Sequence, residues 1–89
     1  MSITLKNKKI IISAGGSGIG WSSAKIFLDK GATVYLCDIN STFLNKCKKH
    51  KLNNKKLFVF RCDASDENQV KNFFSKIIKK TKKIDALIN

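Results

Sequence analysis

The chain has 89 residues, of which 43% are hydrophobic, and this is the length and apolar content of one small globular domain. It contains no run of about 18 apolar residues, which a membrane-spanning helix would need, and its first residues lack the apolar segment of a signal peptide. The formal net charge of +12 raises the question of a polyanionic partner such as nucleic acid.

The cationic residues are almost all lysines, since Arg61 is the only arginine among the 18. Base readout and phosphate clamping favour the planar fork of arginine, and aromatic residues are not interleaved with these lysines in a stacking pattern. We therefore interpret the lysines as a solvated surface. A basic nucleic-acid-binding domain stays as an alternative.

The three cysteines, Cys37, Cys47 and Cys62, are odd in number and lack the spacing of metal ligands. We expect three reduced thiols, no metal site and a cytoplasmic location.

Strand and helix patterns alternate through the first half of the chain. Residues 9–13 include three consecutive isoleucines, a pattern typical of a central parallel strand that is covered on both faces. A helix is predicted over residues 18–30, where Lys30-Gly31 forms a stop signal. Residues 33–37 are rich in β-branched and aromatic side chains and predict a second strand, and a second helix is expected over about 42–51.

The second half continues the alternation. Residues 56–61 predict a third strand, and Ser65 is expected to cap a third helix, with acidic residues in its first turn. The apolar residues of that helix follow helical spacing: Val70, Phe73, Phe74, Ile77 and Ile78. A fourth strand is expected over residues 84–88.

The alternation predicts an α/β fold, a Rossmann-like, doubly wound parallel sheet with right-handed crossovers. Its strand order would be 3-2-1-4, and its ligand crevice would lie over the carboxyl ends of the strands. The fourth strand would then be an uncovered edge.

A glycine-rich turn, Ser13-Ala14-Gly15-Gly16-Ser17-Gly18-Ile19-Gly20, joins the first strand to the first helix. Glycine allows a phosphate to approach the backbone closely, and the helix that follows directs N–H groups and the positive end of its dipole at an anion. Strand, turn and helix together predict a dinucleotide site. The residues expected to present backbone N–H groups to the pyrophosphate are Gly15, Gly16, Ser17, Gly18, Ile19 and Gly20.

This turn resembles the Thr-Gly-x-x-x-Gly-Ile-Gly cofactor motif of the short-chain dehydrogenase/reductase family. Residues 36–39 end the second strand with an acid, as in that family, and residues 61–66 resemble its turn after the third strand. Residues 84–89 are similar to the run into the family's Asn-Asn-Ala-Gly motif. The resemblance runs from Lys9 to Asn89, which is essentially the whole chain. It implies that residues 1–89 form a single segment, the N-terminal part of such an enzyme. One departure is Ala14, which stands where the family has its first glycine.

The resemblance also implies roles for residues at the strand ends. Asp38 would accept hydrogen bonds from the adenosine ribose hydroxyls, Ile39 would pack against adenine, and Asp63 and Ala64 would contact the adenine edge. A carboxylate at position 38 repels a 2′-phosphate, and no Lys or Arg occupies position 17 or 39. NAD is therefore expected in preference to NADP. The structural alternatives are an ordinary surface acid and a simple turn before the third helix.

The family's chemistry implies an oxidoreductase that interconverts an alcohol and a carbonyl by hydride transfer. Its general acid is a tyrosine, assisted by a lysine four residues later and by a serine. The only tyrosine here is Tyr35, and Ile39 lies four residues later. We expect no catalytic residue in this segment, a catalytic part C-terminal to it, and a homo-oligomeric parent that acts on a small-molecule substrate, without a membrane partner. A free-standing nucleotide-binding module without catalysis is the second hypothesis.

Overall fold

The computed structural model describes residues 3–13, 18–51 and 54–88. Strands and helices alternate along the chain, as the sequence predicted. The elements are β1 (Lys9–Ile12), α1 (Gly18–Asp29), β2 (Thr33–Asp38), α2 (Ser41–Lys51), β3 (Leu57–Arg61), α3 (Glu67–Lys80) and β4 (Ala86–Ile88).

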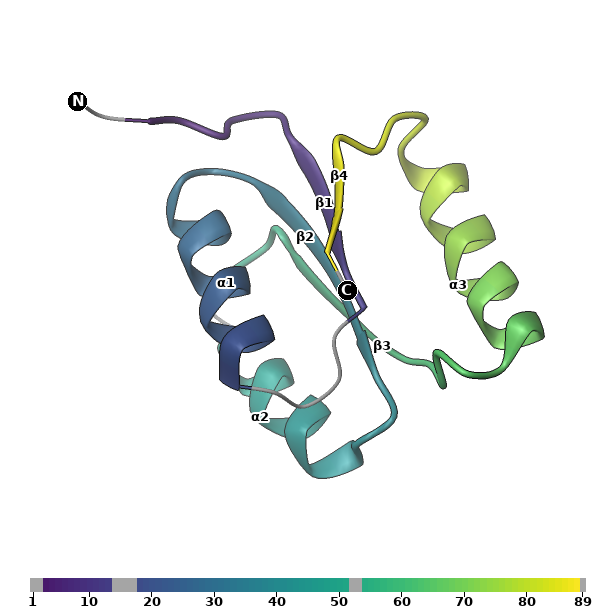
Figure 1. The fold of residues 1–89 in the computed structure, drawn as a ribbon. Helices are drawn as coiled ribbons and strands as arrows, with labels where there is room; N and C mark the ends of the chain where they lie inside the picture. Colours follow the sequence, from purple (N-terminus) through teal and green to yellow (C-terminus); the bar gives the residue numbers. More distant parts are fainter. Residues whose placement is uncertain (1–2, 14–17, 52–53, 89) are drawn as a thin grey trace.

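The strands form one parallel sheet in the order β3-β2-β1-β4, which confirms the predicted order. In the central register, Ile11 of β1 lies beside Tyr35 of β2 on one side and Leu87 of β4 on the other. Because all strands run in one direction, their carboxyl ends meet at one edge of the sheet, from which α1 and α3 also begin (Figure 1).

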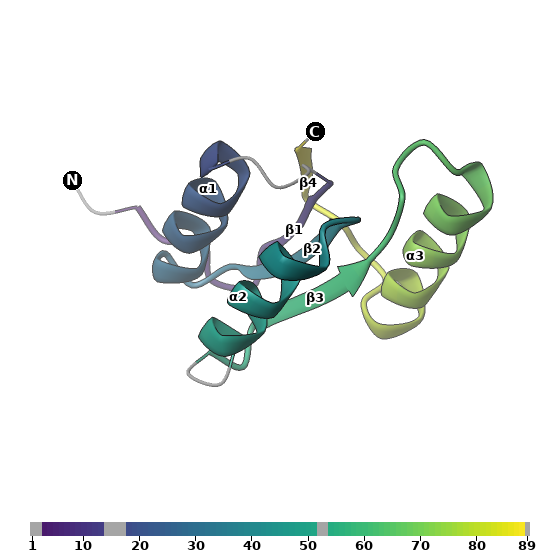
Figure 2. The ribbon, with the colours of Figure 1, turned by 90° about the horizontal axis from the view of Figure 1, so that it is seen from below.

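The helices cover both faces of the sheet. Helices α1 and α2 lie on one face and α3 lies on the other, as two perpendicular views show (Figures 1 and 2). Ile10 and Ile12 are buried on the side of α1 and α2, whereas Ile11 is buried on the side of α3. This confirms β1 as a central strand that is apolar on both faces.

Helix α1 ends where the Lys30-Gly31 signal predicted. Gly31 has a φ of 99°, which favours glycine, and its N–H donates to the carbonyl of Leu28 at 3.0 Å. A Cβ at this position would lie 3.4 Å from backbone atoms of Lys6. The contact with Lys6 is an ordinary one, so it is the left-handed backbone conformation that favours glycine here.

The prediction that Ser65 caps the third helix is wrong, because Asp66 is the N-cap. The Asp66 carboxylate accepts hydrogen bonds from the backbone N–H groups of Asn68 at 3.0 Å and Gln69 at 3.3 Å. Ser65 instead donates its backbone N–H and its hydroxyl to Oδ1 of Asp63, at 2.9 and 2.6 Å. Ser65 is thus bound to the Asp63 carboxylate, and Asp66 accepts hydrogen bonds from the free N–H groups at the start of the helix.

Strand β4 lies at the edge of the sheet, as expected, and Leu87 is 50% exposed. Its start is tied to β1 by a reciprocal pair of hydrogen bonds. The N–H of Lys9 donates to Oδ2 of Asp85 and the N–H of Asp85 donates to the carbonyl of Lys9, both at 2.8 Å. Across the described ranges, no helix has the length and apolar character needed to cross a membrane.

Candidate functional site

The carboxyl ends of β1, β2 and β3 surround a cavity of about 180 Å³. Four residues that the sequence assigned to an adenosine site, Asp38, Ile39, Asp63 and Ala64, line it together. The other lining residues are Ser13, Cys37, Cys62 and Ser65. Parallel strands place their ends at the same edge, so residues that are distant in sequence converge here.

Asp38 is the last residue of β2 and is only 3% exposed. Its Oδ1 accepts a hydrogen bond from the backbone N–H of Asn40 at 2.9 Å. A buried carboxylate needs such donors because desolvation otherwise disfavours its charge. In the sheet, Asp38 lies beside Arg61 of β3. Because Asp38 lines the cavity, its carboxylate can accept hydrogen bonds from hydroxyl groups of a ligand bound there.

Asp63 follows β3 and is held in a tight turn. The hydrogen bond from the Ser65 hydroxyl lowers the pKa of the Asp63 carboxyl below its ordinary value, and the Ser65 backbone N–H and the charge of Arg61 act in the same direction. Asp63 is therefore an ionised hydrogen-bond acceptor at neutral pH.

Gln69 positions this turn, a role that the sequence analysis missed. Its Oε1 accepts from the backbone N–H of Asp63 at 2.8 Å, and its Nε2 donates to Oδ2 of Asp66 at 3.1 Å. The first turn of α3 thus fixes the segment that carries Asp63 and Ala64. The spacing Asp66-x-x-Gln69 is that of a capping box, and it was the available signal for this contact.

Gly18, Ile19 and Gly20 form the first turn of α1, while Gly15, Gly16 and Ser17 lie outside the described residues. Ile19 is 80% exposed. A Cβ built on Gly18 would meet no atom within 4 Å, and in the part of the chain described only Gly31 is a glycine with positive φ. Neither packing nor conformation in the described structure therefore requires glycine at position 18. Close approach of a ligand to this helix terminus would require it.

The thiols of Cys37 and Cys62 line the same cavity and share a hydrogen bond. Burial, the neighbouring Cys62 and the charge of Asp38 raise the pKa of Cys37 to about 12. Cys47 lies in the core on the other face of the sheet, where burial raises its pKa to about 11. All three are free thiols in the structure.

Tyr35, the only tyrosine, is packed in the core. Its ring is 3% exposed and stacks on Phe58 at a centroid distance of 5.2 Å, and burial raises its pKa. A general acid needs access to a substrate, and Tyr35, unlike Asp38, does not line the cavity at the strand ends.

A larger, open cavity of about 530 Å³ lies between the end of α1 and the end of α2, away from the strand ends that carry the predicted site. It is lined by Lys25, Ile26, Leu28, Asp29, His50 and Asn54. Beside it, the ring of Trp21 contacts those of His50 and Phe43 edge-on, at centroid distances of 5.3 and 6.1 Å. Trp21 and His50 therefore join α1 to α2.

Comparison with known proteins decides the family. The family model described as "short chain dehydrogenase" matches residues 8–89. The chain belongs to the short-chain dehydrogenase family. It corresponds to the N-terminal part of such a protein, as its motifs implied.

Relatives of this short-chain dehydrogenase segment include plant, animal and bacterial proteins. It is 34% identical over 85 residues to short-chain dehydrogenase reductase 5 of Arabidopsis thaliana, a match that covers 96% of this chain and 32% of that protein. It is 31% identical over 88 residues to bovine 15-hydroxyprostaglandin dehydrogenase [NAD(+)], covering 96% of this chain and 33% of that protein. The segment thus spans about a third of the length of these relatives.

Solved structures show the same fold. A hydroxysteroid dehydrogenase from Escherichia coli matches with a TM-score of 0.81 and 33% identity, over 97% of this chain and 36% of that one. A short chain dehydrogenase/reductase from Burkholderia phymatum, solved in complex with NAD, matches with a TM-score of 0.83 over 96% of this chain and 31% of that one. The second is 21% identical, so it bears on the fold alone.

Proposed function

We propose that this chain is the NAD-binding part of an oxidoreductase that interconverts an alcohol and a carbonyl by hydride transfer. The observation that carries the proposal is the cavity at the strand ends, which gathers Asp38, Ile39, Asp63 and Ala64. Its place is the one where open α/β sheets bind nucleotides. Membership of the short-chain dehydrogenase family supports the class of reaction.

The residues present fit a dinucleotide. Backbone N–H groups in the first turn of α1 would hold the pyrophosphate, and Asp38 would accept hydrogen bonds from the ribose hydroxyls. Asp63 and Ala64 would bind the adenine edge, held by Ser65 and Gln69. When bound, the nicotinamide ring supplies or accepts the hydride.

The proposed preference for NAD over NADP rests on Asp38. A 2′-phosphate would approach this carboxylate, and the repulsion and the lost ribose hydrogen bonds would both oppose NADP. In the full-length protein, isothermal titration should give a lower dissociation constant for NAD than for NADP. Asp38→Asn should weaken NAD binding roughly tenfold to a hundredfold, because hydrogen bonds to a charged group are lost.

Asp29→Asn is the matched control for that variant, since Asp29 is an exposed acid at the end of α1. It should leave both dissociation constants unchanged. Tighter binding of NADP than of NAD by the wild-type protein would contradict the assignment of Asp38.

Catalysis is proposed to depend on residues outside this chain, because the sequence contains no Tyr-x-x-x-Lys and Tyr35 is buried. The substrate would be a small molecule that those residues select. We further propose a cytoplasmic, homo-oligomeric parent. The three free thiols are consistent with a reducing compartment, and the oligomeric state is testable by light scattering on the full-length protein. The comparisons favour neither a non-catalytic module nor a nucleic-acid-binding domain.

A further inference from the structure

Two cysteines that are distant in sequence line the proposed nucleotide site side by side. Cys37 lies on β2 and Cys62 follows β3, each is 3% exposed, and their thiols share a hydrogen bond. The proposed dinucleotide function uses neither side chain.

The register of β2 and β3 fixes how these thiols face each other. Cys37 lies beside Phe60, and the N–H of Cys62 donates to the carbonyl of Asp38 at 3.0 Å, which continues the ladder past Arg61. Cys62 is therefore two positions beyond the residue that pairs with Cys37, on the same face of the sheet. With strands about 4.8 Å apart and a rise of about 3.3 Å per residue, the Cα atoms of such diagonal neighbours lie about 8 Å apart. A disulfide usually spans no more than about 6.8 Å between Cα atoms. A direct S–S bond would therefore require backbone movement, whereas a metal ion bonded to both sulfurs spans a longer gap between them.

The residues around the two thiols limit which metal ion could bind between them. The two thiols line both the nucleotide cavity and a second cavity of about 190 Å³, whose other walls are mostly apolar. These other residues are Ser13, Ala64, Val70, Phe73, Phe74 and Leu87. Over residues 3–13, 18–51 and 54–88 no group of three or more His, Cys, Asp or Glu side chains is arranged to hold a metal ion. The described residues thus offer no site for an ion that needs four protein ligands, such as structural Zn²⁺.

We propose that Cys37 and Cys62 form a two-coordinate site for a soft, thiophilic cation, with Cu⁺ as the ion. Thiolates are the ligands that select Cu⁺. On binding, each thiol releases its proton to solvent and each sulfur forms one bond to copper, which stays Cu⁺, so that no electron is transferred. The site carries a net negative charge after binding, because two thiolates face one monovalent ion.

Bound copper would weaken the binding of the dinucleotide. This consequence rests on the proposed function. The ion and its two thiolates would lie in the wall of the cavity that also holds Asp38 and Asp63. They would add bulk and negative charge where adenosine is expected to bind. Occupancy of the thiol pair would therefore lower the affinity for NAD.

The test is an anaerobic titration of the full-length protein with Cu⁺, delivered as its complex with a chromophoric chelator. Wild type, Cys37→Ser, Cys62→Ser and Cys47→Ser are compared. Cys47 is the matched control, since it is also a buried thiol but lies in the core on the other face of the sheet. Wild type and Cys47→Ser should each withdraw one more equivalent of copper from the chelator than the other two variants. The affinity should rise with pH because protons are released. Equal stoichiometry in all four proteins would overturn the proposal.

A measurement on the wild-type protein covers the case in which a serine variant fails to fold. After one equivalent of Cu⁺, X-ray absorption should show two sulfur neighbours, and a shell of nitrogen or oxygen would overturn the site. NAD titration of the copper-loaded protein then tests the consequence, with a weaker affinity expected. If copper binds but the affinity for NAD does not change, only the claim that copper and NAD compete is refuted, and the copper site stands. Absence of NAD binding with and without copper would refute the proposed function and leave the copper result standing.

Discussion

At the scale of single residues, Gly18 begins α1 and Gly31 follows its end, and a side chain would have different effects at the two positions. Gly31 has a positive φ, so its requirement for glycine comes from the conformation of the chain itself. Around Gly18 a Cβ would find open space. If the first turn of α1 binds a pyrophosphate, the requirement at position 18 comes from the ligand.

The substitutions Gly18→Ala and Gly31→Ala should therefore separate stability from binding. Gly31→Ala should lower the free energy of unfolding by about 1–2 kcal/mol, the cost of a left-handed backbone for an L-residue, with the NAD affinity unchanged. Gly18→Ala should change the stability by less than about 0.5 kcal/mol, as for an exposed site, and should weaken NAD binding. Urea unfolding and calorimetric titration measure the two quantities. Unchanged NAD affinity in Gly18→Ala would count against phosphate binding at this turn.

At the scale of elements, the start of α3 links the stability of a helix to the shape of the site. Asp66 caps the helix, and Gln69 connects that cap to the backbone of Asp63. Ser65 belongs to the preceding turn rather than to the helix.

The capping assignment predicts different costs for two neighbouring substitutions. Asp66→Ala should lower the free energy of unfolding by about 1 kcal/mol, the usual loss for an N-cap. Ser65→Ala should cost less, and it should raise the pKa of Asp63 toward its ordinary value because the main cause of the lowering is removed. Thermal unfolding and an NMR titration of the Asp63 carboxyl measure these effects. A larger loss of stability in Ser65→Ala than in Asp66→Ala would contradict the assignment of Asp66 as the N-cap and favour Ser65.

The junction of β1 and β4 predicts a pH dependence. The backbone N–H of Lys9 is the main group that lowers the pKa of Asp85, and Lys83 acts in the same direction at 3.3 Å. A lowered folded-state pKa means that this stabilisation is present above the unfolded value, about 3.9, and is lost as the pH falls through the folded value.

Asp85→Asn should therefore be less stable than wild type at neutral pH. The difference should shrink below about pH 4, where the wild-type carboxyl becomes protonated. Urea unfolding across this pH range is the measurement. A difference that stays constant down to the most acidic pH would show that the charge of Asp85 does not contribute.

At the scale of the whole molecule, the layers of the fold followed from the sequence because apolar periodicity and chain alternation are local signals. Three isoleucines in β1 predicted a strand buried on both faces, and Ile10, Ile11 and Ile12 are buried that way. Strand order then followed from the doubly wound alternation with right-handed crossovers.

Details of the site depend on contacts between residues that the local sequence pattern does not predict. Ser65 and Asp66 are both good caps, and Asp63 decides between them by binding Ser65. The meeting of Cys37 with Cys62 requires the register of β2 against β3, which only the assembled sheet provides.

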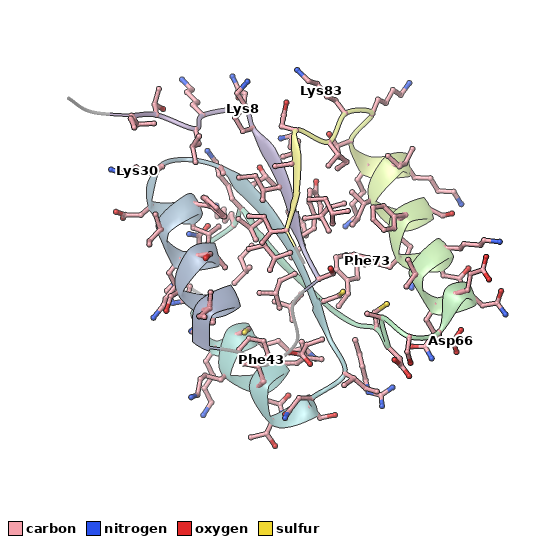
Figure 3. The ribbon with its side chains drawn as sticks, in the orientation of Figure 1. Lys8, Lys30, Phe43, Asp66, Phe73 and Lys83 are labelled. Carbon is pink, nitrogen blue, oxygen red and sulfur yellow. The ribbon has the colours of Figure 1, made fainter. Side chains whose placement is uncertain are left out.

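The charge of the whole molecule differs from that of the site. The net charge is +12, yet Asp38 and Asp63 line the cavity at the strand ends. Lys8, Lys30 and Lys83 lie at the opposite end of the molecule from Asp66, near the amino ends of the strands (Figure 3). These three lysines are thus remote from the proposed nucleotide site.

The central claim is that NAD binds at the carboxyl ends of the strands, and amide chemical shifts of the full-length protein on addition of NAD test it directly. The largest changes should fall on Gly18, Ile39 and Ala64, with little change at Lys8, Lys30 and Lys83. Shifts confined to the lysine-rich end, or no saturable shifts at all, would contradict the account.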